Sequence, residues 1–141
     1  MDSPPLALLL LRASRWFDRQ LLAGLQREGW PALSPTQSLV LAHLDRDGVT
    51  PSELARRLGT SRQATSDLLA GLVRLKLLAL QPNPARRGGK LVVLTEQGRA
   101  LTRDALRLLH DLEVSLGPAR SAELRLLLDP LEDPPARTGP E

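Results

Sequence analysis

Residues 50–75, TPSELARRLGTSRQATSDLLAGLVRL, decide the fold that we expect for this chain. Thr50 can cap a helix that has proline in its first turn, and Gly59 ends that helix after about two turns. Thr60 or Ser61 can then cap a following helix. The leucines spaced four and three residues apart on its expected core face are Leu68, Leu72 and Leu75. Two helices joined by a short turn that contains glycine are a helix-turn-helix.

Proline and glycine divide the N-terminal part of the chain in the same way. Ser34 begins a capping box, SPTQ, and the helix that it opens is expected to end near Asp47-Gly48. Ser3 is expected to cap a long first helix that runs to about Glu28. The core residues expected in the second helix are Leu39, Val40 and Leu44, with Leu41 a weaker candidate.

The C-terminal part begins with two short apolar runs, residues 77–80 and 91–94, on either side of a loop rich in proline, glycine and arginine. This pattern predicts a β-hairpin with a basic tip. Thr95 is expected to cap a helix that Gly117 ends, and a last helix covers about residues 119–128 before Pro130 breaks it. The remaining residues are rich in proline and poor in apolar side chains, so we expect a disordered tail.

The composition of the 141 residues supports a helical chain. Leucine fills 34 positions, valine six and isoleucine none, and the only aromatic residues are Trp16, Phe17 and Trp30. Because β-branched and aromatic residues favour strands, we predict a mostly α-helical fold whose sheet is the small hairpin. The length allows one domain with arms. Three aromatic residues are too few for a surface that stacks unpaired bases, which argues against single-stranded nucleic acid as the ligand.

Several functional classes are excluded or disfavoured by what the sequence lacks. It contains no cysteine and only two histidines, His43 and His110, so thiol chemistry is excluded and acid–base catalysis has few candidates. It contains no phosphate-binding loop, nucleophile elbow or zinc-protease motif. We therefore expect neither an enzyme nor a cofactor or metal site. The longest apolar run, residues 6–11, is too short to span a bilayer and lacks the flanks of a signal peptide, so we expect a cytoplasmic protein without membrane contact.

The net charge of +3 conceals an uneven distribution of charges. Between Glu53 and Lys90 the chain carries eight basic and two acidic residues, whereas the rest carries eleven basic and fourteen acidic residues. A basic cluster by itself is usually a solvated surface. One that coincides with a helix-turn-helix and a hairpin tip is typical of a surface that binds the phosphate backbone of nucleic acid.

Taken together, these segments resemble the MarR family of winged-helix transcriptional regulators. The likeness runs through SPTQ (34–37), TPSELA (50–55), LGTSRQ (58–63) and LVVLTEQGR (91–99), of which the last, after a basic wing, is the most specific. It implies a winged helix-turn-helix joined to a helical dimerisation region, and a homodimer that grips pseudo-palindromic duplex DNA. The implied domains are an N-terminal dimerisation helix (1–30), a DNA-binding domain (31–95), C-terminal dimerisation helices (96–130) and a disordered tail (131–141).

The resemblance also implies which residues contact DNA. The helix after Gly59 would enter the major groove, where arginine can read guanine and glutamine can read adenine, and the hairpin would reach the minor groove. The residues expected to contact DNA are Ser34, Thr36, Ser61, Arg62, Gln63, Ser66, Asp67, Arg86, Arg87 and Lys90. Asp67 replaces a basic residue of the family pattern, Lys76 a glycine that ends the helix, and Leu80 an arginine. Besides these three departures, Ala85 stands before Arg86 where the family carries an acidic residue, and Pro130 shortens the last helix.

The first helix is apolar around most of its circumference, so we expect it to be buried on more than one side. A partner subunit can supply the second cover, and the alternative is a central core helix in a monomer. The residues expected at a dimer interface are Leu6, Leu9, Leu10, Phe17, Leu109, Leu112, Leu116, Leu124 and Leu127.

Many members of the family bind small aromatic acids, and the resemblance implies such an effector pocket here. Its candidate residues are Arg15, Trp16, His43 and Arg107. The resulting hypothesis is a dimeric repressor that binds duplex DNA, either constitutively or until a small aromatic or acidic effector releases it. The alternative, suggested by the three departures, is a winged-helix dimer that no longer reads DNA specifically and acts in protein–protein association.

Overall fold

The helix-turn-helix predicted from residues 50–75 is present, and its helices begin at the predicted caps. In the computed structural model, which describes residues 3–131, α3 covers Pro51–Leu58 and α4 covers Arg62–Arg74. The Thr50 hydroxyl accepts a hydrogen bond from the Glu53 amide at 3.2 Å, and the Ser61 hydroxyl accepts one from the Ala64 amide at 3.1 Å. Gly59 ends α3 with φ of 65°, a left-handed conformation that glycine adopts without strain.

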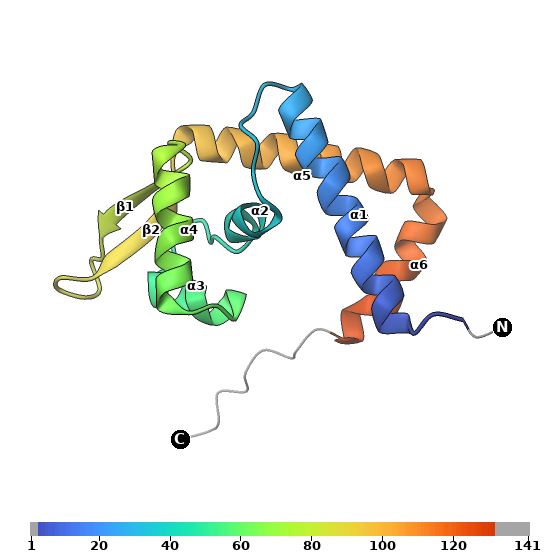
Figure 1. Cartoon of the computed structure of the whole chain (residues 1–141), viewed down its shortest axis with the longest axis horizontal. Coiled ribbons are helices and arrows are strands. Elements are labelled where there is room, and N and C mark those ends of the chain that lie inside the picture. The colour runs from blue at the N-terminus through green and yellow to red at the C-terminus, as the bar shows by residue number, and fades with distance from the viewer. Residues whose placement is uncertain (1–2, 132–141) are drawn as a thin grey trace, which may run out of the picture. The chain divides into compact units, whose positions relative to one another are not determined.

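The other elements agree with the predicted order (Figure 1). The two strands are antiparallel, with Leu78 opposite Leu94 and Pro82 opposite Lys90, and Val49 adds a bridge to Val92. The chain is therefore mostly helical with a small hairpin, which confirms the predicted winged helix-turn-helix fold. The bounds of the remaining elements are α1 Leu6–Arg27, α2 Pro35–Ala42, β1 Leu78–Pro82, β2 Lys90–Leu94, α5 Glu96–Leu116, α6 Pro118–Leu128 and the short 3-10 helix η1 Asp129–Leu131.

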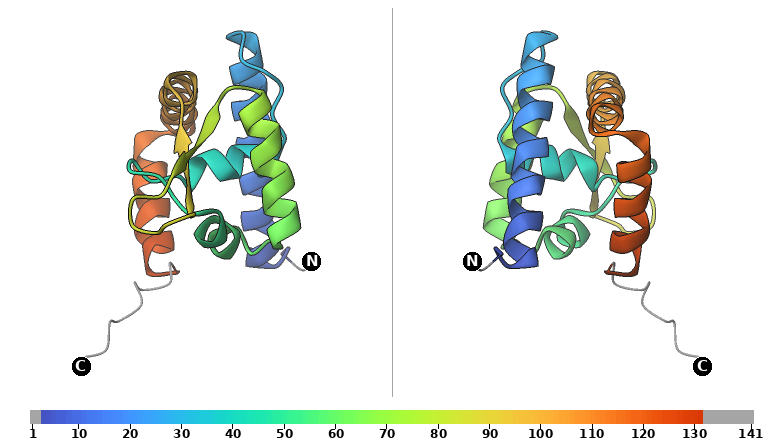
Figure 2. Two further views of the ribbon diagram at one scale, coloured as in Figure 1. Left: turned by 90° about the vertical axis from the view of Figure 1, so that its left-hand side faces the viewer. Right: turned by 90° about the vertical axis from the view of Figure 1, so that its right-hand side faces the viewer.

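Two compact units make up the chain, one up to Leu108 and one from Leu109 onward, so that the boundary falls inside α5. In the first unit α4 packs against α2, α3 and β1, and α3 packs against β2 (Figure 2). The core therefore lies beneath the helix-turn-helix. All buried apolar side chains among residues 3–131 belong to this unit: Leu21, Leu25, Leu33, Val40, Leu41, Val49, Leu54, Ala55, Leu69, Leu72, Leu77, Leu78, Val92 and Leu101.

The core face of α4 differs from the predicted one by part of a turn. Thr65, Leu69 and Leu72 are buried, whereas Leu68 and Leu75 are only half-buried. Thr65 is tolerated in the core because its hydroxyl bonds to the Ser61 carbonyl at 2.8 Å and lies 2.7 Å from the Thr60 hydroxyl. A threonine does not register as apolar in a hydrophobic pattern, which is why the predicted face was rotated.

The first two helices are shorter than predicted. Ser3 does not cap α1: the helix begins at Leu6 after Pro5, because the residue before a proline is disfavoured in the helical region and Pro4 precedes Pro5. The second helix, α2, ends at Ala42 rather than near Asp47-Gly48.

The early end of α2 has a tertiary cause. The Arg57 side chain of α3 donates to the His43 carbonyl at 2.9 Å and to the Asp45 carboxylate, and so holds this segment outside the helix. The α2 core residues are Val40 and Leu41; Leu39, predicted to be buried, is 46% exposed.

The C-terminal predictions need smaller changes. The strands cover 78–82 and 90–94 instead of 77–80 and 91–94, because Leu77 is buried in the turn that precedes β1. Gly117 ends α5 with φ of 103°, as predicted, and Pro130 falls in η1. The predicted tail lies outside the described residues, except for Leu131 at the end of η1. Within residues 3–131, no helix combines the length and the apolar character that crossing a membrane requires.

Lys76 adopts a left-handed conformation, with φ of 62°, in the turn between α4 and β1. A side chain with a Cβ is strained there by about 1–2 kcal/mol, whereas glycine is not, although glycine also makes the unfolded chain more flexible. We therefore expect Lys76→Gly to raise the free energy of unfolding by about 0.5–1 kcal/mol in urea titrations. Lys76→Ala is the control, because it removes the same charge but keeps the strain. Equal stability of the two variants would contradict this account.

Candidate nucleic-acid interface

The exposed face of α4 is set by its buried one. With Thr65, Leu69 and Leu72 in the core, the side chains on the opposite side of the first two turns are exposed to solvent. The polar ones are Arg62, Gln63, Ser66 and Asp67, the set predicted to face DNA, and Ala64 is exposed beside them. The N-terminal end of α4 therefore presents one cation, one anion and two neutral hydrogen-bonding groups side by side.

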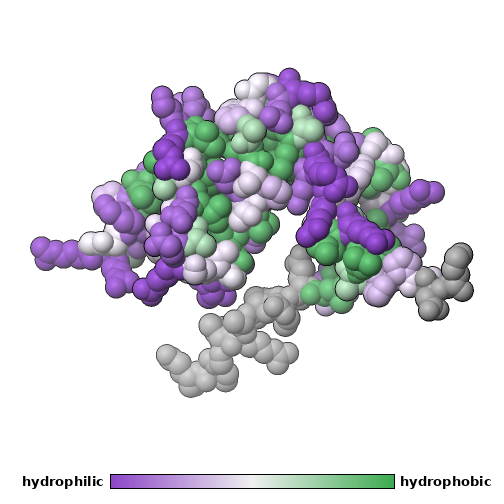
Figure 3. Space-filling model, in the orientation of Figure 1, coloured by the Kyte–Doolittle hydropathy of each residue, from purple (hydrophilic) through white to green (hydrophobic). Residues whose placement is uncertain are grey.

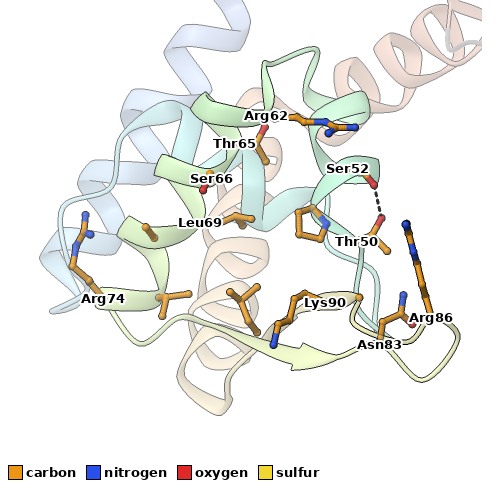
Figure 4. Close-up of a pocket in the computed structure, with 15 residues that line it drawn as sticks. Thr50, Ser52, Arg62, Thr65, Ser66, Leu69, Arg74, Asn83, Arg86 and Lys90 are labelled. Carbon is orange, nitrogen blue, oxygen red and sulfur yellow. Dashed lines mark hydrogen bonds between the residues drawn. The ribbon is translucent and has the colours of Figure 1, made fainter.

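A groove with a cavity volume of about 810 Å³ separates α4 from the hairpin. Leu69, Ala70, Val73 and Leu80 are among the side chains that line it, and the cations Arg62, Arg74, Arg86 and Lys90 stand around it (Figure 4). Thr50 and Ser52, whose hydroxyl oxygens lie 3.4 Å apart, close it at the start of α3. The groove thus combines an apolar floor with a positive rim.

The hairpin loop that carries two of the wing cations has a defined backbone. The Asn83 amide donates to the Gly89 carbonyl at 2.9 Å, and the Gly89 amide donates to the Arg86 carbonyl at 3.0 Å. Gly88 supplies the positive φ, 76°, that the turn requires. Arg86 lines the groove and Arg87 is exposed beside it at the loop tip. Figure 3 shows hydrophilic side chains projecting from this end of the chain.

A second groove, of about 560 Å³, lies between the start of α2 and α4. Ser34 and Thr36 line it from α2, and Asp67 and Arg74 line it from α4. Ser34 forms the complete capping box predicted for it, in which its hydroxyl accepts from the Gln37 amide at 3.1 Å. The predicted DNA-contacting residues that line neither groove are Ser61, Gln63 and Arg87, which are all exposed.

Two of the eight basic residues between Glu53 and Lys90 are not free to attract an anion. Arg56 Nε donates to Glu53 at 2.8 Å, and Arg57 forms ion pairs with both Glu53 and Asp45. The Arg57–Asp45 pair holds α3 to the preceding loop, whereas the pairs with Glu53 lie within α3. The remaining six, Arg62, Arg74, Lys76, Arg86, Arg87 and Lys90, form no ion pair with any residue that the structure describes.

The Arg56 and Arg57 guanidinium groups lower the pKa of Glu53 from 4.5 to about 2 through hydrogen bonds, and the hydrogen bond from Arg57 also lowers the pKa of Asp45. Because the folded-state pKa values are depressed, these carboxylates stabilise the fold above their unfolded pKa values and cease to do so as pH falls. We expect the urea midpoint of unfolding to fall between about pH 4.5 and pH 2, and to fall less in Glu53→Gln. An identical acid dependence in this variant would contradict the assignment.

Sequence reasoning missed Arg74 as an interface residue. Arg74 lines both grooves, and it could have been found from the spacing of four residues from Arg62 through Ser66 and Ala70. Asn83, Thr50 and Ser52 were also missed, since turn and capping residues carry no sequence signal that distinguishes binding from structure.

Neither groove is lined by the residues predicted to form an effector pocket. Trp16 packs edge-on against Phe17, with ring centroids 5.0 Å apart, and Arg15 is exposed on α1. His43 Nδ1 lies 2.8 Å from the Leu39 carbonyl oxygen. The last of the four, the Arg107 guanidinium, donates to both Glu28 carboxylate oxygens at 2.7 Å.

The described residues contain no group of three or more histidine or acidic side chains that could hold a metal ion. The residues predicted to lie at a dimer interface are exposed or half-exposed in the single chain. Leu6 and Leu9 on α1 are 67% and 45% exposed, and Leu124 and Leu127 on α6 are 49% and 64% exposed. Leu116 is also exposed, and Leu10, Phe17, Leu109 and Leu112 are intermediate.

Comparison with known proteins agrees with this architecture. A model of the MarR family matches residues 33–87, and no curated protein sequence matches significantly. Apo wild-type MarR from E. coli has 27% sequence identity and a TM-score of 0.72 over 94% of this chain and 100% of that chain. A MarR mutant from E. coli complexed with operator DNA has 28% identity and a TM-score of 0.69 over 92% and 95% of the two chains.

A mutant of MepR from S. aureus bound to an oligodeoxyribonucleotide has 20% identity and a TM-score of 0.63 over 92% of this chain and 100% of that chain, which supports the fold alone. The match over residues 33–87 covers the helix-turn-helix and β1 but ends before β2, and the likeness to MarR extends over nearly the whole chain. Residues 33–87 match the MarR family, and the chain shares the winged-helix fold of the E. coli MarR structures over nearly its whole length.

Proposed function

We propose that the protein is a homodimeric transcriptional repressor that binds pseudo-palindromic duplex DNA. The observation that carries the proposal is the group of cations without an ion-pair partner among residues 3–131, several of which rim the groove between α4 and the hairpin. Six such charges on one winged helix-turn-helix favour binding to the phosphate backbone of DNA, because each phosphate that they neutralise releases condensed counterions. The operator complex of a MarR mutant that is 28% identical to this chain supports the same partner.

In the proposed complex, α4 enters the major groove with Arg62, Gln63, Ser66 and Asp67 leading. Arg86 and Arg87 at the hairpin tip reach the adjacent minor groove, where narrow A·T-rich sequence attracts arginine. Hydroxyl groups at helix starts suit phosphate oxygens, and this is the role we assign to Ser34, Thr36 and Ser61. Arg74 and Lys90, on opposite sides of the groove, add positive charge along the DNA backbone.

The proposed dimer accounts for the exposed leucines on α1 and those on α6, since a helix that exposes several large apolar side chains marks an interaction surface. A twofold dimer presents two recognition helices to one face of the duplex. Half-sites about 10 base pairs apart, one helical turn, are therefore expected. A MarR structure described as a multiple antibiotic resistance repressor is 26% identical to this chain, which supports repression as the direction of regulation.

Release by a small aromatic or acidic effector stays a prediction. Such a molecule acts only if it binds the state that does not bind DNA more tightly than the state that does. Of the predicted pocket residues, Arg107 is already bonded to Glu28 and lies 3.4 Å from Asp104. An acid that uses Arg107 must therefore displace the Glu28 carboxylate, and screening small acids against the protein–operator complex tests this step.

Selection of duplexes from a random pool, followed by salt titration on the enriched site, tests the proposed function. We expect enrichment of a pseudo-palindrome and an affinity that falls steeply as salt rises. In transcription assays with this site at a promoter, addition of the protein should lower the transcript level. Equal weak binding to all duplexes would contradict sequence-specific regulation and would favour the alternative, a winged-helix dimer that acts in protein–protein association.

The wing offers a separate prediction. Arg86→Ala combined with Arg87→Ala should weaken operator binding about 10- to 100-fold and reduce the salt dependence by about two released ions. Both side chains are exposed and form no ion pair with a described residue, so the thermal midpoint should not change. Fluorescence anisotropy over a salt series measures both effects.

The matched control is Arg103→Ala combined with Arg120→Ala, which removes two exposed arginines outside both grooves. Equal affinity of the wing and control variants would show that the wing does not contact DNA.

A further inference from the structure

Asp67 is the one acidic residue of α4, and it lies on the face that the proposed function directs toward DNA. It is exposed, and it forms no ion pair with any residue of the described chain. A carboxylate near phosphate groups is repelled, because like charges raise the energy of the complex. On a surface that meets DNA, Asp67 is therefore favourable only where it accepts a hydrogen bond from a base.

The structure joins Asp67 to Gln63, one helical turn earlier. Gln63 Nε2 donates to Asp67 Oδ1 at 3.0 Å. Because a carboxylate can only accept, this bond decides which end of the Gln63 amide faces Asp67. It uses one of the two amide N–H bonds of Gln63. The second N–H, the Gln63 Oε1 acceptor and the Asp67 Oδ2 acceptor are left for a ligand.

These remaining groups match base edges in the major groove. Adenine presents an amino donor beside the N7 acceptor, and a glutamine reads both with one carbonyl and one N–H, which are the groups that Gln63 retains. Cytosine presents only its N4 amino donor, which suits a carboxylate. Adenine suits a carboxylate less well, because its N7 lone pair faces the negative charge.

Resting on the proposed function, we infer that Gln63 and Asp67 act as one base-reading unit. Asp67 accepts from the N4 amino group of a cytosine and at the same time holds the Gln63 amide in the orientation that reads an adenine. The two residues are about 6 Å apart along the helix axis, and successive base pairs are about 3.4 Å apart. The two bases therefore lie one or two steps apart in each half-site.

Parallel selections with wild type, Asp67→Asn and Gln63→Ala test this unit, and anisotropy competition measures discrimination at each position. Wild type should enrich cytosine one or two steps from adenine, with a loss of about 10- to 100-fold for the wrong base pair. Asp67→Asn should shift the cytosine position toward adenine and weaken discrimination at the adenine position, because asparagine does not fix the Gln63 amide. Gln63→Ala should remove the adenine preference. Asp47→Asn is the charge-matched control on an exposed residue of the same unit that lines neither groove, and it should change neither preference.

The contrary outcomes are distinct. If Asp67→Asn binds every duplex more tightly by the same factor with unchanged base preference, Asp67 faces phosphate, and the inference is wrong while the proposed function stands. If Asp67→Asn changes only the preference at the cytosine position, the two side chains read their bases independently and the unit does not exist. If wild type enriches no sequence at all, the proposed function fails and the inference fails with it.

Discussion

Gly98→Ala is expected to lower the free energy of unfolding by about 3 kcal/mol, at the upper end of the usual cost of overpacking a core. Gly98 is buried in the first turn of α5, where the helix meets the turn before β1. A Cβ at this position would lie 2.1 Å from the carbonyl oxygen of Leu77, a distance well inside the 3.0 Å that real side-chain carbons essentially never pass. The contact is with backbone, so no side chain can rotate out of the way.

The backbone of Leu77 is held on both sides. Its carbonyl accepts from the Thr95 amide at 3.1 Å, and its amide donates to the Leu72 carbonyl at 3.1 Å. The Leu77 side chain is only 1% exposed, so the residue is anchored in the core as well. An added methyl group at Gly98 must therefore push the start of α5 away from the turn and break the Thr95 bond.

Urea unfolding followed by circular dichroism measures the expected loss of stability. Gly71→Ala is the matched control, since it adds the same methyl group inside a helix of the same unit. The nearest atom to its Cβ is the flexible end of Gln37, at 3.3 Å. The higher helix propensity of alanine should leave this variant as stable as wild type or about 1 kcal/mol more stable. A Gly98→Ala variant within about 0.5 kcal/mol of wild type, the range of an ordinary surface substitution, would contradict the contact.

Replacing Leu124 and Leu127 by glutamate should convert the proposed dimer into a monomer and weaken operator binding by more than about 100-fold. The two leucines lie three residues apart on one face of α6 and are 49% and 64% exposed. Burying each against a partner subunit would contribute about 1.5–3 kcal/mol, and glutamates would reverse that gain by repulsion across the twofold axis. Loss of the second half-site contact then removes the avidity of a bivalent complex, which is worth about 100- to 10,000-fold.

Sedimentation equilibrium measures the mass, which should fall from twice 15.4 kDa to that of one chain. The substitutions leave α6 tied to the end of α5, because the Ser121 hydroxyl and the Arg125 guanidinium bond to the Glu113 carbonyl and carboxylate respectively. Leu39→Glu, at a leucine 46% exposed on α2, is the control and should remain dimeric. A double variant that keeps the mass of a dimer would place the interface elsewhere.

The fold was predictable where local chemistry decides it. Caps such as Ser34, Thr50 and Ser61 mark where helices begin because their hydroxyl groups satisfy free amides, whatever the rest of the chain does. Gly59 and Gly117 mark where helices end because both adopt positive φ angles that other residues avoid. Ser3 failed as a cap, because the two prolines that follow it impose their own backbone conformation.

The sequence predicted which cations and hydroxyl groups lie at the interface. It did not predict which of those cations are already paired with a carboxylate of the chain. Charge counting assigned Arg56 and Arg57 to the positive surface, whereas Glu53 and Asp45 bind them. The pairs with Glu53 follow from spacings of three and four residues within α3. The Arg57–Asp45 pair depends on how the loop before α3 folds back, and sequence spacing does not report this. Arg74 was predictable from its spacing along α4, but the hairpin strand that forms the other wall of its groove is contributed by a later segment.

The sequence by itself determined the helix-turn-helix, the basic hairpin and the likeness to the MarR family, because caps, glycines and leucine spacing act over a few residues. The Gln63–Asp67 bond is local as well, because it joins residues one helical turn apart. Only the tertiary structure decided which side of α4 is buried and which arginines stay free. These depend on packing between segments far apart in the chain. The net charge of +3 thus conceals two groups of cations that folding separates. One group forms ion pairs at α3, and the other lines the rim of the groove beside α4.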